Sequence, residues 1–324
     1  MNKINQLRNI LNQQNCDGYL IPKNDEYFGE YVPKNKDRLK FISGFTGSAG
    51  LALILKNKSY LFVDGRYTLQ AKAEINKNFE ICEIPKIKPH YILKNLNKKI
   101  TLGFDPKLFT SSTLKNIISN SLIKPKPINN NLIDIIWKNK KKINNNKFYI
   151  LEEKYHGENY LNKISKVCKF LKLKDIHYLL TTATENISWL LNIRGSDALY
   201  SPLTNGKILF NKNGKIIFFT NIKKITPQIK KAFKKKVIFI KEELFVNYLR
   251  KIKNSKILID KKTCSFYYEK NIHSSNTVIN IEDPIYLLKA IKNKTEINNT
   301  KIAHLFDGIA LTKFIFWLKN NYRK

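Results

Sequence analysis

The sequence predicts an α/β protein built from two copies of one unit, in each of which a mixed sheet is flanked by helices. The main observation is that helices, a hairpin and further strands recur in the same order in both halves, at an offset of about 150 residues, which indicates duplicated domains instead of a solenoid of short repeats. The second observation is size. The chain has 324 residues, 43% of them hydrophobic, which is enough for two domains with separate cores.

The first half begins with a helical pattern over residues 4–11, followed by a strand over 19–21, a further helical pattern and a glycine-rich loop. Two apolar runs joined by a polar Lys-Asn-Lys-Ser turn then predict a β-hairpin. The remaining elements expected here are the hairpin strands 51–55 and 60–63, a helix over 67–75, and strands over 79–83 and 101–104.

The second half repeats this order. A helix over residues 160–171 precedes a strand over 176–180, and a second helix starts at Thr184. The hairpin within residues 207–219 turns at Asn213-Gly214, a pair that two-residue hairpin loops prefer. A helix over 222–233 and strands over 236–240 and 256–259 complete the predicted repeat.

These patterns divide the chain into four segments. Residues 1–137 and 147–282 are the two units, and residues 138–146 form a Lys/Asn-rich linker with a solvated character. Residues 283–324 follow a second break at Asp283-Pro284 and are strongly helical. Their apolar positions recur at helical spacing and form a wide face that must pack on something: Ile302, Phe306, Ile309, Ala310, Phe314 and Trp317.

Glycines gather between residues 41 and 71, which hold four of the 12 in the chain: Gly44, Gly47, Gly50 and Gly65. Such a cluster predicts backbone that turns sharply or lets another group come close. Asp64 directly precedes a helical stretch and is suited to cap it. The segment is therefore expected to be a built loop, not a linker.

The formal net charge is +34, from 59 Lys and Arg against 25 Asp and Glu. Clustered cations would indicate binding to nucleic acid or to an anionic membrane. Only six of the basic residues are Arg, however, and the lysines are spread along the chain among many Asn and Ile. This favours compositional drift towards A+T-rich codons, with a selected basic face as the alternative, so nucleic acid is not an expected partner.

Because Lys is so abundant, each Arg marks a place where a planar fork of donors is useful. Arg66 lies in Asp-Gly-Arg-Tyr and Arg194 in Asn-Ile-Arg-Gly-Ser-Asp. Both are candidates for contacts with a carboxylate or with backbone carbonyls. The alternative for each is a structural fork that ties loops together.

The cysteines predict a reduced, cytosolic environment. Cys16, Cys82, Cys168 and Cys264 are far apart and show neither paired spacing nor a C-x-x-C motif, so they indicate buried thiols, not zinc ligands or disulfides. The polar N-terminus shows no signal peptide, and no apolar run reaches the length of a membrane span. We therefore expect a cytoplasmic protein with no membrane partner.

No complete active site is visible in the sequence. The five histidines are scattered, without an H-E-x-x-H pattern, and neither a phosphate-binding loop nor a dinucleotide fingerprint occurs. His177 lies in a predicted strand and is expected to be a satisfied core residue. His304 and Asp307, three apart on the predicted C-terminal helix, are either a positioned acid/base pair or a capping or inter-helix contact.

Several motifs, taken in order, resemble the Xaa-Pro aminopeptidase (aminopeptidase P) family of the creatinase/prolidase superfamily, in its three-domain form. They span essentially the whole chain: Ser43–Gly50, Asp64–Tyr67, Asn131–Trp137, Trp189–Asp197, Lys289–Asn293 and Ala303–Leu311. The resemblance implies two creatinase-N-type domains, followed by the first helices of a pita-bread catalytic domain whose remainder is missing.

The resemblance also implies a chemistry. The family removes the N-terminal residue that precedes proline, using two divalent metals, usually Mn²⁺, held by two Asp, one His and two Glu of the catalytic domain. Those ligands lie downstream of the segment matched by Asp307–Leu311, so no metal ligand or catalytic residue is assigned in this chain. We expect a truncated reading frame, one half of a split gene or a fragment, inactive by itself.

In the family, the N-terminal domains help to form dimers, cover the active-site entrance and limit substrates to peptides. By resemblance, Arg66, Arg194 and Asp197 are candidates at that entrance, with peptides and a second copy as partners. Gly44, Gly47, Gly50, Asp64, Gly65 and Gly195 are then expected to shape the loops. The alternative function is a stand-alone, non-catalytic binding or dimerisation module with a basic surface.

Overall fold

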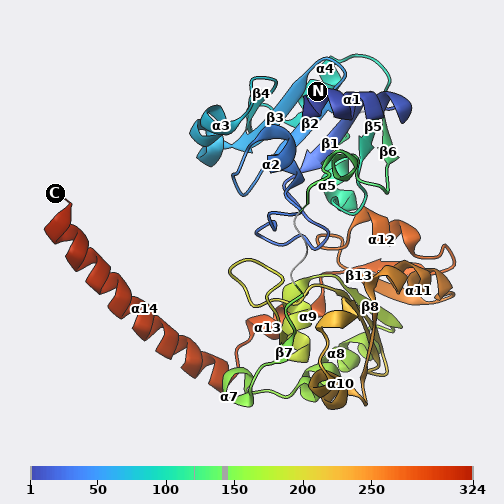
Figure 1. Ribbon diagram of the computed structural model, residues 1–324. Helices are drawn as coiled ribbons and strands as arrows, with labels where there is room; N and C mark the ends of the chain where they lie inside the picture. The colour runs from blue at the N-terminus through green and yellow to red at the C-terminus, as the bar shows by residue number, and fades with distance from the viewer. Residues whose placement is uncertain (1, 120, 141–144, 323–324) are drawn as a thin grey trace.

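The chain folds into two α/β units that share one sheet topology. A computed structural model describes residues 2–119, 121–140 and 145–322, and it shows two separate six-stranded sheets (Figure 1). The first has the strand order β4-β3-β2-β1-β5-β6 and the second β12-β11-β10-β8-β13-β14. We call the units domain I and domain II. The prediction of a duplicated α/β fold is therefore confirmed.

In domain I, an antiparallel β1-β2-β3 meander is extended by parallel strands on both sides. Its strands are β1 (Gly18–Pro22), β2 (Leu51–Leu55), β3 (Ser59–Asp64), β4 (Glu80–Ile84), β5 (Ile100–Phe104) and β6 (Ile123–Pro127). Its helices are α1 (Lys3–Gln13), α2 (Arg38–Ser43), α3 (Thr68–Glu74), α4 (Pro89–Asn95), α5 (Ser111–Ile117) and α6 (Leu132–Ile136).

Domain II repeats this pattern of antiparallel and parallel pairs. Its sheet contains β8 (Tyr178–Thr181), β10 (Lys207–Asn211), β11 (Ile216–Thr220), β12 (Val237–Lys241), β13 (Lys256–Ile259) and β14 (Thr277–Asn280), and a small sheet pairs β7 (Tyr149–Ile150) with β9 (Ile193–Arg194). Its helices are α7 (Glu153–His156), α8 (Tyr160–Leu173), α9 (Thr184–Leu191), α10 (Pro227–Phe233), α11 (Phe245–Lys251) and α12 (Phe266–Asn271).

One predicted helix is corrected. Residues 222–233 do not form a continuous helix, because a short 3-10 turn (Ile222–Lys224) ends before α10 begins at Pro227. Proline lacks a backbone N–H and so fits the first position of a helix better than its interior. The predicted linker lies in part outside the described residues, at positions 141–144.

Each sheet carries a hydrophobic core on both faces, because successive side chains of a strand point to opposite sides. In β1, Tyr19 and Ile21 pack with the core beneath α1, α2 and α6, whereas Leu20 joins the core beneath α4 and α5. Domain II is organised in the same way, with a larger core under α8, α9 and α10 and a smaller one under α11 and α12.

The two domains are joined by main-chain and side-chain contacts. At the start of α12, the N–H groups of Phe266 and Tyr267 donate to Phe109 O and Pro106 O of domain I, at 2.7 and 2.9 Å. Further along the interface, the hydroxyl of Tyr27 in domain I donates to Glu242 Oε2 in domain II, at 2.7 Å.

A buried lysine belongs to this interface. Lys207, 1% exposed, forms an ion pair with Glu242, and its ammonium lies 4.4 Å from the centre of the Tyr27 ring. The domains are thus held together by a desolvated charge pair as well as by backbone hydrogen bonds.

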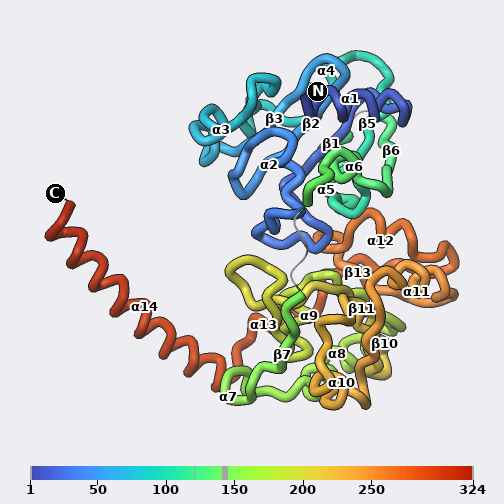
Figure 2. Tube along the Cα trace, in the orientation of Figure 1, coloured from blue at the N-terminus to red at the C-terminus, as the bar shows by residue number. Residues whose placement is uncertain are grey.

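Two helices follow domain II. α13 (Pro284–Ala290) packs on it, and α14 (Lys294–Asn321) starts with a capping box formed by Asn293 and Glu296. Figures 1 and 2 show α14 running away from both domains after its first turns.

Apolar side chains of α14 are exposed in the described chain, with Phe306 67% and Trp317 57% accessible. With 3.6 residues per turn, they cover two opposite faces and not one. Ile302, Leu305, Phe306 and Ile309 lie on one side, and Leu311, Phe314, Ile315 and Leu318 lie on the other. A helix that is apolar all round is normally buried on all sides.

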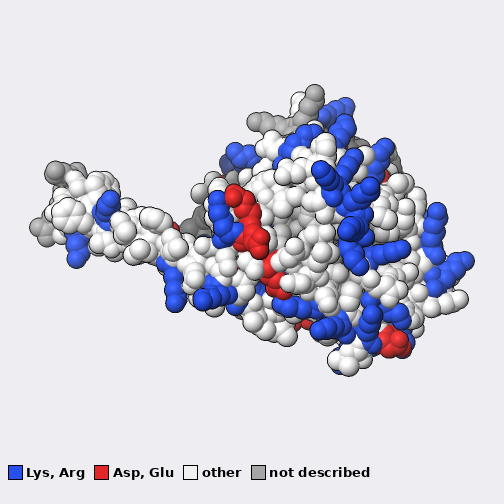
Figure 3. All heavy atoms as spheres, turned by 90° about the horizontal axis from the view of Figure 1, so that it is seen from below, with Lys and Arg blue, Asp and Glu red and all other residues white. Residues whose placement is uncertain are grey.

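On the face of the molecule seen from below, basic side chains occur in several places and not in one patch (Figure 3). In the view from below, blue side chains are scattered over the visible face, with a few acidic groups between them (Figure 3). None of the helices in the described ranges is long and apolar enough to cross a membrane.

Candidate functional site

The two glycine-containing loops occupy equivalent places in the duplicated units. In domain I, α2 ends at Gly44, whose φ of +88° is in the left-handed region, and the loop that follows leads into the β2-β3 hairpin. In domain II, α9 ends at Asn192, also left-handed with φ of +51°, and its loop leads into the β10-β11 hairpin. Glycine and asparagine are the residues that adopt this helix-ending conformation most readily.

The loop of domain I is held by a carboxylate. The backbone N–H and the hydroxyl of Thr46 both donate to Glu74 of α3, at 2.7 and 2.5 Å, and Gln70 donates to the same carboxylate at 3.0 Å. Burial alone would raise the pKa of Glu74, but these hydrogen bonds outweigh it and lower the pKa. A Cβ at Gly47 would lie 2.2 Å from the Phe45 ring, so only glycine fits there.

Arg66 is exposed and bonded to its own N-cap residue. Its Nε and Nη2 donate to Asp64 at 3.0 and 2.8 Å, and the Arg66 side chain is 73% accessible. Asp64 also accepts from the Arg66 N–H, as expected of a capping residue, at the start of a 3-10 turn that precedes α3. The Arg66 hydrogen bond is the main cause of a lowered pKa for Asp64. Gly65 has no neighbour that requires a glycine, since the nearest atom to a Cβ would be 3.9 Å away.

Arg194 is directed to the protein's own backbone. Its Nη1 donates to Ser188 O at 2.6 Å and to Ile193 O at 3.1 Å, which ties β9 to the helix before it. Next to it, Gly195 allows the Phe148 ring to approach, because a Cβ would lie 2.7 Å from that ring. These bonds correspond to the alternative given for Arg194 from the sequence, a structural role in which the guanidinium connects loops of the protein itself.

Asp197 lies further along the same loop and is buried in an ion pair with Lys224. Both side chains are 5% accessible, and Asp197 also accepts from Asn205 N at 2.8 Å. The pair fastens the loop to the segment that precedes α10.

A second buried lysine, Lys163, holds the start of this loop and is not apparent from the sequence. Its ammonium donates to Trp189 O at 2.9 Å and to Asn192 Oδ1 at 2.6 Å, and it lies 4.0 Å from the Trp189 ring centre. Burial lowers the pKa of Lys163 to about 8. The one available signal was its position in α8, on the same face as Ile164, Val167 and Leu171.

The candidates do not assemble into one catalytic centre. No hydrogen bond or ion pair between described residues joins Arg66 of domain I to Arg194 or Asp197 of domain II. His304 and Asp307 are both exposed on α14. His177 accepts a backbone hydrogen bond from Lys256 through Nδ1, at 3.0 Å, which agrees with a structural histidine. Across residues 2–119, 121–140 and 145–322, no three His, Cys, Asp or Glu residues are grouped so as to hold a metal ion.

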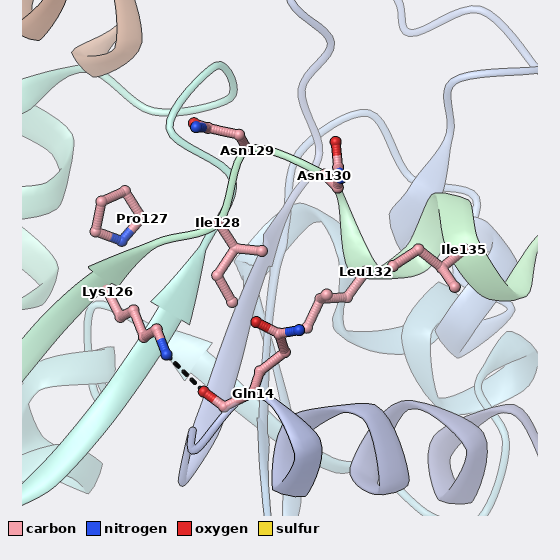
Figure 4. A pocket seen from close by; sticks show the side chains of 8 residues that line it. All are labelled: Gln14, Lys126, Pro127, Ile128, Asn129, Asn130, Leu132 and Ile135. Carbon is pink, nitrogen blue, oxygen red and sulfur yellow. Dashed lines mark hydrogen bonds between the residues drawn. The ribbon is translucent and has the colours of Figure 1, made fainter.

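Two surface cavities have mixed polar and apolar linings, and neither brings together a recognisable catalytic group. One, of about 280 Å³, lies between the end of α1, β6 and α6, where Lys126 donates to Gln14 O at 2.6 Å (Figure 4). The other, of about 500 Å³, lies where the domains meet, between α5 and the ends of β13 and β14. Its cationic residues are Lys115, Lys261 and Lys262, and its acidic residues are Asp260 and Glu282.

Both halves of the chain match models of known families. Two models of the creatinase/prolidase N-terminal domain match it, one over residues 3–132 and the other over residues 139–296. The chain is also 30% identical to a probable Xaa-Pro aminopeptidase P from Laccaria bicolor, over 98% of this chain and 51% of that protein. Xaa-Pro aminopeptidase 1 from Dictyostelium discoideum is likewise 30% identical, over 98% of this chain and 53% of that protein.

The fold is similar to a crystal structure of X-prolyl aminopeptidase from Caenorhabditis elegans, described as a cytosolic enzyme with a di-nuclear active site. The TM-score is 0.89 at 24% identity, and the match covers 98% of this chain and 55% of that one. The chain therefore spans about half the length of the proteins that it resembles.

Proposed function

Because the chain belongs to the aminopeptidase P family and consists largely of two creatinase/prolidase N-terminal domains, we propose that it is the non-catalytic, N-terminal part of a metal-dependent Xaa-Pro aminopeptidase. The complete enzyme removes the residue that precedes proline at the N-terminus of a peptide, in the cytoplasm. The main support for this proposal is that family models of the creatinase/prolidase N-terminal domain match both units, including their loops.

In the proposed enzyme, the residues that bind the metal ions belong to the catalytic part and not to domains I and II. Two divalent ions, Mn²⁺ in our proposal, would activate the water that attacks the peptide bond. Such ions need a convergent set of carboxylate and imidazole ligands, and the described residues contain no such group. We therefore assign no residue of this chain to the ions and no catalytic step to it.

Helix α14 is the proposed contact with the catalytic part. Its apolar side chains cover opposite faces, so burial of both requires a partner that surrounds the helix. Association of this kind would place domains I and II beside the catalytic part, where they limit access to peptides. A homodimer of the complete enzyme is part of the same proposal.

Arg66 remains our candidate for a peptide contact at the entrance, because its side chain is accessible and its bonds are to a partly exposed neighbour, Asp64. Arg194 and Asp197 are proposed to act indirectly, by holding the loop between β9 and β10 in place. The bonds that support this are Arg194 to Ser188 O and Asp197 to Lys224.

The test is a hydrolysis assay on the purified 324-residue chain with an Xaa-Pro tripeptide and added Mn²⁺. We expect no release of the N-terminal residue, while a full-length aminopeptidase P assayed in parallel is active. Metal-dependent release by this chain, abolished by a chelator and retained through repurification, would overturn the proposal. Tight binding to nucleic acid at physiological salt, together with no hydrolysis, would favour the alternative of a basic binding module.

A further inference from the structure

Tyr200 is a bulky aromatic residue at a backbone position where glycine is usual. It is the second residue of a two-residue turn between Ala198 and Ser201, which pair as an isolated antiparallel bridge. Its φ is +62°, in the left-handed region, which Gly and Asn adopt readily but a residue with a large ring adopts only at a cost in folding free energy. Strain of this kind is concentrated at functional sites, where the residue is kept for its side chain.

The ring that this strained turn carries faces solvent. Tyr200 is 88% exposed, so folding gains little from burying it. Its ring meets that of Tyr31 in domain I edge to face, with centroids 5.2 Å apart and planes at 82°. Tyr31, 40% exposed, lies in the loop between β1 and α2, which Figure 2 shows above the loop that follows β9. The two rings form an aromatic pair that bridges the domains and leaves ring faces free for a further contact.

The loop that carries Tyr200 is closed at its base. Asp197 N donates to Leu203 O at 3.2 Å, and Gly195 N donates to Pro202 O at 3.4 Å. The buried ion pair between Asp197 and Lys224 then fastens this base to domain II. The turn therefore projects its ring from a fixed support.

The loop of domain I is also fixed. Its buried Asp25 accepts from Tyr27 N at 2.9 Å, and the Tyr27 hydroxyl donates to Glu242 of domain II at 2.7 Å. Tyr31 follows in the same loop, so an interface that is already formed places it next to Tyr200. Aromatic side chains that are held in position before binding lose little conformational entropy when a ligand arrives.

The two loops differ in charge from the rest of the chain. Lys and Arg make up 59 of its 324 residues, but residues 24–33 and 195–206 contain neither. Most acidic side chains on these loops are bonded to N–H groups or to cations, and Glu30 is exposed. Single-stranded nucleic acid stacks its bases on aromatic rings but also needs cations along its backbone, and these loops supply none. The surface is better suited to an uncharged, apolar group.

We propose that Tyr31 and Tyr200 together form a peptide-binding platform, on which an uncharged apolar residue of a peptide, with proline as the best fit, packs against the exposed ring faces. Segments that contain proline are extended and have little conformational entropy to lose, which is why they bind to surfaces lined by aromatic residues. The inference rests on the proposed function, in which the complete enzyme acts on such peptides. It assigns to the two N-terminal domains a direct contact with the substrate.

The first test is an NMR titration of the 324-residue chain, with its tyrosine rings labelled with ¹³C, against the blocked peptide acetyl-Ala-Pro-Pro-Ala-amide. This peptide has no free N-terminus, so binding is measured apart from hydrolysis. We expect saturable shifts of the Tyr31 and Tyr200 ring signals, which are identified by their absence from the spectra of Tyr31→Ala and Tyr200→Ala. Signals that stay in place, or that shift equally with acetyl-Ala-Ala-Ala-Ala-amide, would overturn the proposal.

The same two variants measure the contribution of each ring. Each should weaken peptide binding about fivefold, observed on the signal of the remaining ring, because one aromatic contact is lost. Tyr91→Ala is the matched control, since Tyr91 of α4 is 45% exposed but lies outside both loops, and it should leave the affinity unchanged. Equal affinity in wild type and both loop variants would contradict the platform. Shifts of the two rings with oligothymidylate and not with the peptide would replace it with a nucleic-acid site.

A comparison of Tyr200→Gly with Tyr200→Ala separates the ring from the backbone. Both variants lose the ring, but only glycine relieves the left-handed conformation. We expect the folding equilibrium constant of the glycine variant to be about fivefold higher in urea unfolding, with the same loss of peptide binding in both. A glycine variant no more stable than the alanine variant would show that the turn is unstrained and would remove the reason to assign Tyr200 a function.

The failure of this inference and the failure of the proposed function give different results. Metal-dependent hydrolysis of an unblocked Xaa-Pro peptide by the chain would overturn the proposed function. Absence of ring shifts with the blocked peptide would overturn the platform alone.

Discussion

Domains I and II each contain a loop at the equivalent place in the fold, and the two loops are anchored by side chains of opposite charge. The loop after α2 is fixed by the carboxylate of Glu74, which accepts from Thr46 at the surface. The matching loop after α9 is fixed by buried ammonium groups, Lys163 at its start and Lys224 on Asp197. The strand order of the two sheets is nevertheless the same.

This difference teaches that the duplicated topology is specified by the order of strands and hairpins, whereas each loop is anchored by local chemistry. The buried charges of domain II are paired or hydrogen-bonded, as desolvated charges must be. Domain I anchors its loop with charge-assisted hydrogen bonds that water can partly replace. Substitutions in domain II are therefore expected to have the larger effects.

The largest effect is expected for Lys207→Ala, at the first residue of β10. The equivalent strand of domain I, β2, starts with Leu51, so only domain II carries a charge at this position. Removal of Lys207 leaves Glu242 at the interface without its cation, which we expect to lower the free energy of unfolding by about 3–5 kcal/mol. Urea unfolding at pH 7 measures this, with the exposed Lys215→Ala on the same hairpin as a control that should change little.

Asp197→Asn should have an intermediate effect. The amide oxygen can still accept from Asn205, but the buried Lys224 loses its counter-charge. We expect a loss of about 2 kcal/mol, the range measured for hydrogen bonds to charged groups. An unchanged urea midpoint would contradict a stabilising role for this pair.

Glu74→Gln tests the loop of domain I and should have the smallest effect, about 0.5 kcal/mol at neutral pH, because one acceptor oxygen remains. Since the pKa of Glu74 is lowered on folding, its contribution is present at neutral pH and disappears as pH falls. The difference between wild type and variant, measured by thermal unfolding, should therefore shrink on acidification. A difference that grows instead would show that Glu74 acts by another route.

Local patterns were sufficient for much of the fold. The Asn213-Gly214 pair turns its hairpin with Gly214 at a φ of +84°, and Gly44 ends α2 in the left-handed region, both as expected from residue type. The helix predicted over residues 222–233 failed because the apolar spacing continued across Pro227, where a new helix starts.

The buried charged residues that hold the domains and loops in place could not be predicted from the sequence, and the reason is physical. Lys207 and Glu242 are far apart in the chain, and Tyr27 reaches them from the other domain. Among so many lysines, those that are buried look like those that are solvated. The sequence singled out Arg66 and Arg194 as candidate forks, but it could not give their partners: Arg194 donates to the backbone and Arg66 donates to Asp64.

The most direct test of opposite anchoring is the pH dependence of unfolding for wild type and Lys163→Met. Burial lowers the pKa of Lys163 from 10.5 to about 8, so the unfolded chain binds the extra proton and stability rises with pH in that window. We predict that wild type gains about 2 kcal/mol relative to Lys163→Met between pH 7 and pH 9.5. A constant difference between the two proteins across this range would contradict a charged, buried lysine at the loop of domain II.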